Sequence, residues 1–275
     1  MLQEALVPLH LKWLRDTKER LKTSDGKNVV VWELCYQMDE EVLSCWAKHF
    51  RNQYCFEEEI DKLRDGTGLN RADFIRQFIF PDKSDGFGPG IRAGDFGEIL
   101  VSDFLEFILG YWVPRTRYNK KDIPDESTKG CDVVGFKVIE KGEESTNDIL
   151  RTFEVKTQFS GDKAKTRLQD AVNGSANDPT KIGVSLNAIK RRLLSMGKED
   201  DAKRISRFQN PEDHPYREKS GAAALFSSNL YDPNLIKTTN CQNHPNVANL
   251  TLLIIRGDDL MHLVHELYRR SADEA

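Results

Sequence analysis

Two short stretches of the chain carry acidic and basic residues at a spacing suited to phosphodiester hydrolysis. Asp132 opens one β-rich run, and the next β-rich run carries Glu154, Lys156 and Gln158. Because side chains alternate between the faces of a strand, the last three are predicted to share one face. A carboxylate beside a lysine on one strand face is costly to bury unless a site uses it. The pattern therefore indicates an active site.

The chemistry that this arrangement favours is metal-dependent. Mg²⁺ prefers oxygen ligands, and it usually takes one or two carboxylates, waters and a substrate phosphate. Asp132 and Glu154 are predicted to supply the two carboxylates, the Val155 carbonyl a further oxygen, and Glu98, in a strongly helical segment upstream, a third carboxylate. Lys156 would then lie beside the metal-bound water and orient it. The predicted cofactor is Mg²⁺ or Mn²⁺.

Each of these residues also has an ordinary structural interpretation. Alternating charges are common on exposed strands, so Glu-x-Lys alone is a weak signal. Asp132 can cap the start of its strand, and Glu98 can be an acidic residue favoured by a helix dipole. Gln158 can contact a phosphate or a base, or it can support Lys156. The combination of residues, rather than any one of them, predicts the catalytic set.

Composition limits the classes of protein to which the chain can belong. Of 275 residues, 31% are charged, and the formal net charge is −4. No apolar run approaches the roughly 20 residues of a membrane span. The first residues lack the basic region and cleavage site of a signal peptide, so we expect a cytoplasmic protein with no membrane partner. The five cysteines form no Cys-x-x-Cys motif, which favours reduced thiols over a disulfide framework.

Basic residues cluster in the middle of the chain although the net charge is negative. Such clusters can form a phosphate-binding face if the folded chain brings them to one side. The alternative is that they are ordinary solvated charges. The residues predicted to bind nucleic acid are Arg115, Arg117, Lys163, Lys165, Lys190 and Arg191.

The order of predicted elements changes at a Pro- and Gly-rich stretch. Before it, residues 1–22, 39–64 and 70–79 have helical patterns, so residues 1–80 are predicted to be a mostly helical regulatory or partner-binding region. Residues 81–93 are predicted to be a linker. The remainder, 94–275, begins with a helix over 95–109 that ends at Gly110. The predicted strands after it are 111–118, 132–140, 149–158, 221–227 and 249–256, and the predicted helices are 181–197 and 258–270.

Other motifs argue for no further chemistry. His262 and His265 are three residues apart on a helix, a spacing that can bind a metal, but no second pair accompanies them. Cys241 and His244 have ligand-like spacing, yet a zinc site needs four ligands. We interpret all four as structural. The chain has neither a Gly-x-x-x-x-Gly-Lys-Ser/Thr phosphate loop nor a Gly-x-Ser-x-Gly motif, so we expect neither ATP hydrolysis nor serine-hydrolase chemistry.

With these residues placed on it, the order of elements over residues 94–230 resembles the PD-(D/E)XK nuclease superfamily. The resemblance implies an α/β fold with an α-β-β-β-α-β core, in which a mixed sheet is flanked by helices. Asp132 matches the acidic residue of the second core strand, and Glu154 with Lys156 matches the Glu-x-Lys of the third. Glu98 matches the glutamate of the first helix. The residue before Asp132 is Cys131 and not the proline of the superfamily's name, but many members lack that proline.

A narrower resemblance is to the HamA-type nuclease effectors of the Hachiman anti-phage system. It rests on the helical N-terminal pattern, on the Gly-Asp-x-Gly-Glu stretch that contains Glu98, and on the Lys-Gly-x-Asp stretch that ends at Asp132. It implies a DNA nuclease held in check by a partner helicase of the HamB type.

Two alternatives to this reading stay open. One is a stand-alone, sequence-specific restriction endonuclease. The other is a catalytically inactive module with a nuclease fold that binds DNA or a helicase. The sequence does not predict the oligomeric state, the DNA specificity or the residues that would contact a partner.

Overall fold

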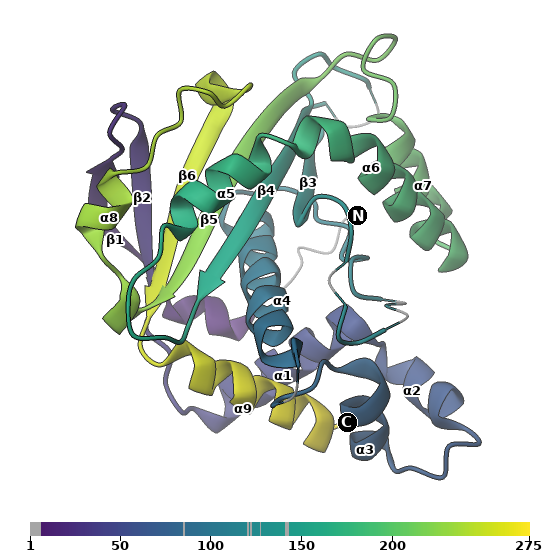
Figure 1. The fold of residues 1–275 in the computed structure, drawn as a ribbon. Coiled ribbons are helices and arrows are strands. Elements are labelled where there is room, and N and C mark those ends of the chain that lie inside the picture. The colour runs from purple at the N-terminus through teal and green to yellow at the C-terminus, as the bar shows by residue number, and fades with distance from the viewer. Residues whose placement is uncertain (1–6, 85, 120, 122, 127, 141–142) are drawn as a thin grey trace.

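The computed structural model describes residues 7–84, 86–119, 121, 123–126, 128–140 and 143–275. Its centre is a six-stranded sheet in the order β1-β2-β6-β5-β4-β3, with helices on both faces (Figure 1). The fold is therefore α/β, as predicted. The strands are β1 (Leu14–Lys22), β2 (Asn28–Leu34), β3 (Val133–Lys137), β4 (Ile149–Gln158), β5 (Arg217–Ser227) and β6 (Leu250–Gly257).

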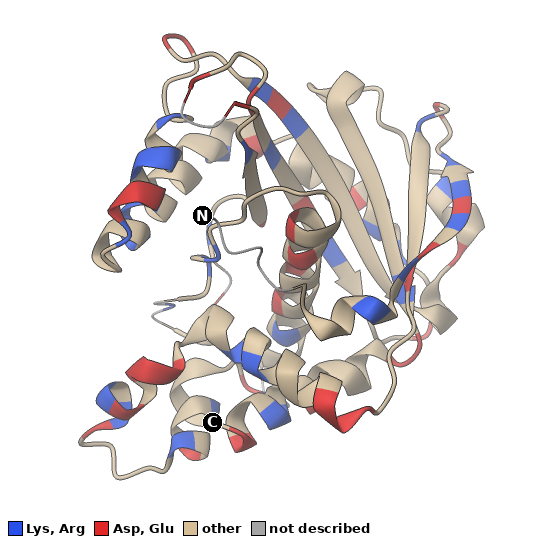
Figure 2. Cartoon of the chain, turned by 180° about the vertical axis from the view of Figure 1, so that it is seen from behind, with Lys and Arg blue, Asp and Glu red and all other residues tan. Residues whose placement is uncertain are grey.

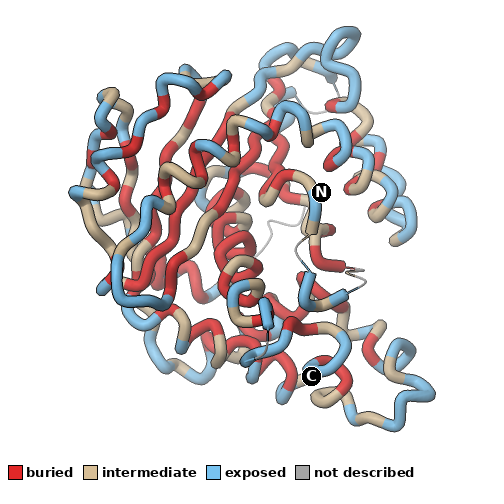
Figure 3. Tube along the Cα trace, viewed as in Figure 1, coloured by how far each residue is buried: buried red, intermediate tan, exposed pale blue. Residues whose placement is uncertain are grey.

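The sheet is parallel in the middle and antiparallel at its edges. Strands β4, β5, β6 and β2 pair in parallel, whereas β3 pairs antiparallel with β4 and β1 pairs antiparallel with β2. Parallel strands covered on both faces read as continuous apolar runs, and β5 is such a run, with Ala222, Ala223 and Ala224 fully buried (Figure 3). The residue before them is Gly221, and this position needs glycine because a Cβ there would lie 2.3 Å from the ring of Phe153.

One face of the sheet is covered by α4 (Gly88–Asp103), α1 (Glu40–Tyr54) and α9 (Leu260–Asp273). On the other face lies α5 (Arg167–Ser175), while α6 (Asp178–Ser195) and α7 (Glu199–Ser206) pack beside β3 (Figure 1). Among the described residues no helix is both long and apolar enough to cross a membrane. The shorter helices are α2 (Glu57–Arg64), α3 (Arg71–Phe74), α8 (Pro233–Lys237), the 3₁₀ turns Leu9–Trp13, Ser228–Leu230 and Val247–Asn249, and the π-helical turns Ile75–Ile79 and Phe104–Ile108.

The helix predicted over residues 1–22 is wrong for residues 14–22, which form β1, while residues 1–6 lie outside the described residues. The helical spacing of apolar residues there is overridden by backbone pairing, because β1 joins β2 and β2 joins β6. A register shift between Asp16 and Arg20, with Lys18 at a φ of 64°, disturbs the alternation that would have marked a strand. The N-terminal region is thus partly β and shares one hydrophobic core with residues further along the chain. A separate regulatory role for residues 1–80 stays a prediction.

The predicted strand over residues 111–118 is also wrong, apart from a single bridge between Trp112 and Phe136. Pro114 has no N–H to donate, and Arg115 has a φ of 53°, so the chain turns away from the sheet. The predicted linker over 81–93 is too long, because α4 begins at Gly88. The helix prediction over 95–109 is confirmed by α4 and the π-helical turn after it, which end before Gly110 at a φ of 70°.

Candidate active site

Helix α4 lies close against β4 because one of its residues has no side chain. A Cβ at Gly97 would lie 2.5 Å from the Cγ2 of Thr157 and 3.4 Å from Val155. These two residues point toward α4, so the alternation of β4 sends Glu154 and Lys156 to the opposite side of the strand. The close approach brings Glu98, the next residue of α4, to the junction between β3 and β4.

Asp132 lies one residue before β3 and is fixed by both neighbouring elements. Its Oδ2 accepts a hydrogen bond from the backbone N–H of Val155 at 2.9 Å, and its Oδ1 pairs with Arg117 at 2.9 Å. Burial, followed by the negative charge of Glu98, raises the pKa of Asp132 to about 7. Arg117 opposes this rise but does not cancel it.

Glu98 is buried and is held by the same arginine. Its Oε2 accepts hydrogen bonds from Arg117 Nε and from the hydroxyl of Tyr118, each at 2.5 Å. Burial raises the pKa of Glu98 although Arg117 opposes that change. Arg117 therefore bridges Glu98 and Asp132 with one guanidinium. Burial disfavours the charge of Arg117, but the two carboxylates outweigh this and raise its pKa.

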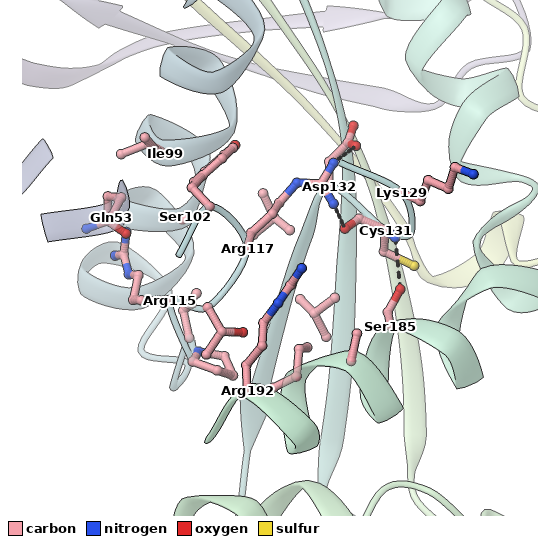
Figure 4. Close-up of a pocket in the computed structure, with 18 residues that line it drawn as sticks. Gln53, Ile99, Ser102, Arg115, Arg117, Lys129, Cys131, Asp132, Ser185 and Arg192 are labelled. Carbon is pink, nitrogen blue, oxygen red and sulfur yellow. Dashed lines mark hydrogen bonds and ion pairs between the residues drawn. The ribbon is translucent and has the colours of Figure 1, made fainter. Parts of the chain in front are cut away.

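Arg117 is also fixed by backbone carbonyl groups. It donates to the carbonyl of Cys131 at 2.6 Å and to that of Thr128 at 3.2 Å, and Figure 4 shows its side chain directed toward Asp132 and Cys131. Behind it lies a small cavity of about 60 Å³ that extends to α6, where Ser185 accepts a hydrogen bond from the Cys131 N–H at 3.0 Å. These contacts explain why the chain leaves the sheet after residue 114.

Glu154 and Lys156, which the sequence predicted to share one strand face, form an ion pair. Lys156 Nζ lies 2.6 Å from Glu154 Oε1. Burial disfavours the charge of Lys156, yet the hydrogen bond and charge of Glu154 dominate and raise its pKa. The second oxygen of Glu154, Oε2, is buried without a hydrogen-bond partner, and Lys181 Nζ lies 3.7 Å from it. At Gly174 of α5 a Cβ would lie only 2.5 Å from Oε1, so this helix also needs a glycine.

A groove of about 590 Å³ opens over part of this cluster. Glu98, Asp132 and Lys156 line it together with the backbone of the strand end. Lys165 and Arg167, from the segment after β4, line the same groove and add positive charge. Figure 2 shows acidic residues along the central helix α4, whereas lysines and arginines are spread over many elements. The groove is thus where carboxylates and cations meet.

Gln158 and the basic residues that follow it have a different arrangement from the predicted one. Gln158 donates through Nε2 to the Lys163 carbonyl at 2.7 Å and accepts at Oε1 from the Lys165 N–H at 2.9 Å. Its buried amide therefore stabilises the segment after β4 rather than Lys156, and a contact with a phosphate or base stays a prediction. Of the two lysines predicted to bind nucleic acid, Lys165 lines the groove and Lys163 is an exposed residue of the same segment.

The remaining basic residues predicted to bind nucleic acid do not gather at the groove. Arg115 pairs with Asp103 at 2.7 Å and with Glu106 at 2.6 Å. Lys190 donates to Gln209 at 3.0 Å, and Arg191 is exposed on the same helix, α6. None of the three lines the groove. Their binding to nucleic acid stays a prediction, and the structure gives Arg115 an internal structural contact.

Asp178, the first residue of α6, was missed by the sequence analysis. It is 2% exposed, and Thr152 is the one hydroxyl that acts on its carboxylate among the described residues, without ideal hydrogen-bond geometry. Burial raises its pKa to about 6, and the charge of Glu154 adds to that effect. Lys181 Nζ lies 3.9 Å from its Oδ1. Because an Asp followed by Pro is common at a helix start, the sequence gives no signal that this carboxylate lies beside Glu154.

The oxygen donors fit a hard divalent cation, but Arg117 and the lysines already compensate them. Among the described residues no three His, Cys, Asp or Glu side chains converge closely enough to hold a metal. Arg117 bridges two of the predicted carboxylates, and Lys156 binds the third. The unpartnered Oε2 of Glu154 is an oxygen that an added cation could bind. A cation can enter only if Arg117 moves away.

Comparison with known proteins identifies the family. The family model described as HamA matches residues 8–271, which is nearly the whole chain. No curated protein matches it. The match includes β1 and β2 as well as the carboxylate cluster, so the family is defined over the complete sheet.

Proposed function

Since the chain belongs to the HamA family, we propose that it is a metal-dependent deoxyribonuclease. We propose further that it acts as the DNA-degrading component of a Hachiman anti-phage defence system, with a helicase as its partner. One observation carries the nuclease proposal: Glu98, Asp132 and Lys156 come from three separate elements and line one groove, with Glu154 paired to Lys156. Carboxylates and a lysine in a cation-lined groove match what phosphodiester hydrolysis requires.

The residues that would hold Mg²⁺ or Mn²⁺ are Glu98, Asp132 and Glu154, with the Val155 carbonyl. The bound metal would act as a Lewis acid on the phosphate and activate a water. Lys156 is fixed by Glu154 at 2.6 Å, so its remaining N–H groups can donate to the attacking water or to a phosphate oxygen.

The segment after β4 would bind the DNA backbone beside this centre. Gln158 fixes that segment through two backbone hydrogen bonds, which places Lys165 at the groove. Arg167 adds a second cation. Because contacts to phosphates carry no sequence information, these residues support DNA degradation rather than recognition of one site.

The test is cleavage of plasmid, linear duplex and single-stranded DNA with Mg²⁺ or Mn²⁺, by the protein alone and with its partner helicase. We expect Glu154→Ala and Lys156→Ala to abolish cleavage while circular dichroism shows an intact fold. Lys203→Ala, which changes an exposed lysine of α7, is the matched control and should cleave normally. Discrete fragments would identify a restriction endonuclease, and a continuous decrease in length would identify degradation. If neither the protein nor its complex cleaves, the nuclease proposal is wrong.

A second candidate is a catalytically inactive module that binds DNA or a helicase. The observation that favours it is the arginine between Glu98 and Asp132, which supplies a permanent positive charge where a metal would be needed. This candidate predicts DNA or helicase binding that EDTA does not change, and no cleavage under any of the conditions above.

A further inference from the structure

A second cavity, of about 420 Å³, lies between α9 and the segment that leads into α4. Figure 1 shows α9 crossing below α4 at this place. Four basic side chains at this cavity are Lys83, Arg92, His262 and His265. The two histidines are the pair on α9 that the sequence analysis interpreted as structural, and the proposed nuclease chemistry does not use them.

Two further arginines at the cavity are already neutralised. Arg269 pairs with Glu266 at 2.6 Å and with Asp273 at 2.8 Å, and Arg76 also pairs with Asp273. Glu266, the acidic residue of the described lining, is therefore taken up by an arginine. The charge left over at this cavity is positive.

Arg92 is the strongest sign of a missing anion. It is 7% exposed, and its guanidinium lies 4.4 Å above the ring of Tyr268. Its Nε donates to the Pro81 carbonyl at 2.7 Å, but it forms no ion pair with a carboxylate among the described residues. The negative charges of Asp82 and Asp125 also act on Arg92 and offset part of the effect of burial on its pKa. Buried arginines are normally paired, because an uncompensated buried charge is costly.

The other basic side chains surround the same space. The pKa of His265 is lowered by burial first, and then by the positive charges of Arg92, Lys83 and His262. These four groups therefore act on one another electrostatically across one space. An arrangement of like charges around a cavity is stabilised when an anion enters it.

The cavity is continuous with the catalytic groove. His265 lines both, and Arg92 faces the cavity while Ala93 and Gly94, the next residues of α4, line the groove. We propose that the cavity binds a phosphate group, and that this phosphate belongs to the backbone of the nucleic acid whose scissile bond lies in the groove. Guanidinium and imidazole donors suit a phosphate oxygen. The phosphate site rests on charge and geometry, whereas its nucleic-acid source rests on the proposed function.

The test uses a double variant, Lys83→Glu with His262→Glu, since both residues are exposed. The control, Lys22→Glu with Lys203→Ala, changes the formal charge by the same amount at pH 8, on β1 and α7. Binding of a labelled 20-base-pair duplex is measured by fluorescence anisotropy in EDTA over a range of KCl concentrations. Binding of inorganic phosphate is measured by calorimetry. Neither assay needs metal or cleavage, so failure of the nuclease proposal would not affect them.

We expect the double variant to bind duplex about tenfold more weakly than the control, with a salt slope smaller by roughly one, which corresponds to one lost phosphate contact. We also expect it to lose the phosphate binding that the wild type shows. If the double variant loses phosphate binding but binds duplex like the control, the ligand is a small phosphate compound and the nucleic-acid source is refuted. If phosphate binds the wild type and the double variant equally, or binds neither of them, the cavity is not a phosphate site.

Discussion

Replacing Arg117 by alanine tests whether Glu98 and Asp132, which this arginine now neutralises, can bind a metal ion instead. In the wild type one guanidinium compensates Glu98, which is buried, and Asp132, which is half-buried. Without it two neighbouring carboxylates remain in a low-dielectric region. Removing one partner of a buried ion pair costs about 3 to 5 kcal/mol, because the other charge stays uncompensated. We therefore expect Arg117→Ala to be destabilised by that amount in EDTA at pH 8.

A divalent cation should reverse most of this loss if the carboxylates form a metal site. At a Mg²⁺ concentration 100 times the dissociation constant, binding to the folded state alone adds about 2.7 kcal/mol. The wild type should gain less, since Mg²⁺ must first displace Arg117 from both carboxylates. The assay is urea unfolding with EDTA or with 10 mM Mg²⁺, followed by circular dichroism.

Arg115→Ala is the matched control for this experiment. It also removes a guanidinium that pairs with two carboxylates, Asp103 and Glu106. Asp103 keeps two histidine partners, and neither acid lines the groove. Mg²⁺ should not stabilise this variant. The reasoning is refuted if Mg²⁺ stabilises both variants equally, or if Arg117→Ala is as stable as the wild type in EDTA.

Three further predictions concern stability around the site. Asp178→Asn should be more stable than the wild type at pH 8 by at most about 3 kcal/mol, because the pKa of Asp178 is about 6 in the folded state against the ordinary 3.8, so ionisation is costly only there. The helix dipole reduces this gain in stability. In urea unfolding at a series of pH values, the gain should fade as the pH falls from 6 to below 4. Gly174→Ala should displace Glu154, lower the free energy of unfolding by about 1 to 3 kcal/mol and lower the rate of cleavage. In the control Gly183→Ala the new methyl group meets open space, so this variant should unfold at the same or a higher urea concentration than the wild type. Gln158→Ala leaves two backbone groups of the next segment unpaired, so trypsin should cut there faster than in the wild type, and an unchanged rate would contradict the supporting role.

The part of the site that the sequence could predict is the part carried by one strand. The period of two along β4 places Glu154 and Lys156 on one side, and the ion pair between them confirms this. Asp132 was predictable because it precedes an apolar run that becomes β3. The central strands and α9 were predictable for the same reason, since their apolar patterns are long and uninterrupted. Local periodicity is enough wherever burial follows the period of one element.

Other parts depended on contacts between distant segments. Residues 14–22 have helical spacing, yet they form a strand because β2 is already paired with β6. The stretch after Tyr111 contains strand-forming residues, but the chain turns at Arg115 and brings Arg117 to the carboxylates. No periodicity encodes that an arginine will bind two acids 15 and 19 residues away in the chain. Asp178 was missed for the same reason, since only the packing of α6 places it near Glu154.

The charge balance of the site connects these observations to its regulation. Each carboxylate side chain proposed to bind the metal already pairs with a cation of the protein. Arg117 pairs with Glu98 and Asp132, and Lys156 pairs with Glu154. On the proposed function, a metal ion would therefore replace an internal cation rather than fill a vacant site. Because Arg117 is held by carbonyl groups of the segment after residue 127 as well, anything that moves this segment also changes metal affinity. If the chain is the nuclease proposed above, a partner that keeps this segment in place would hold it inactive without covering its groove.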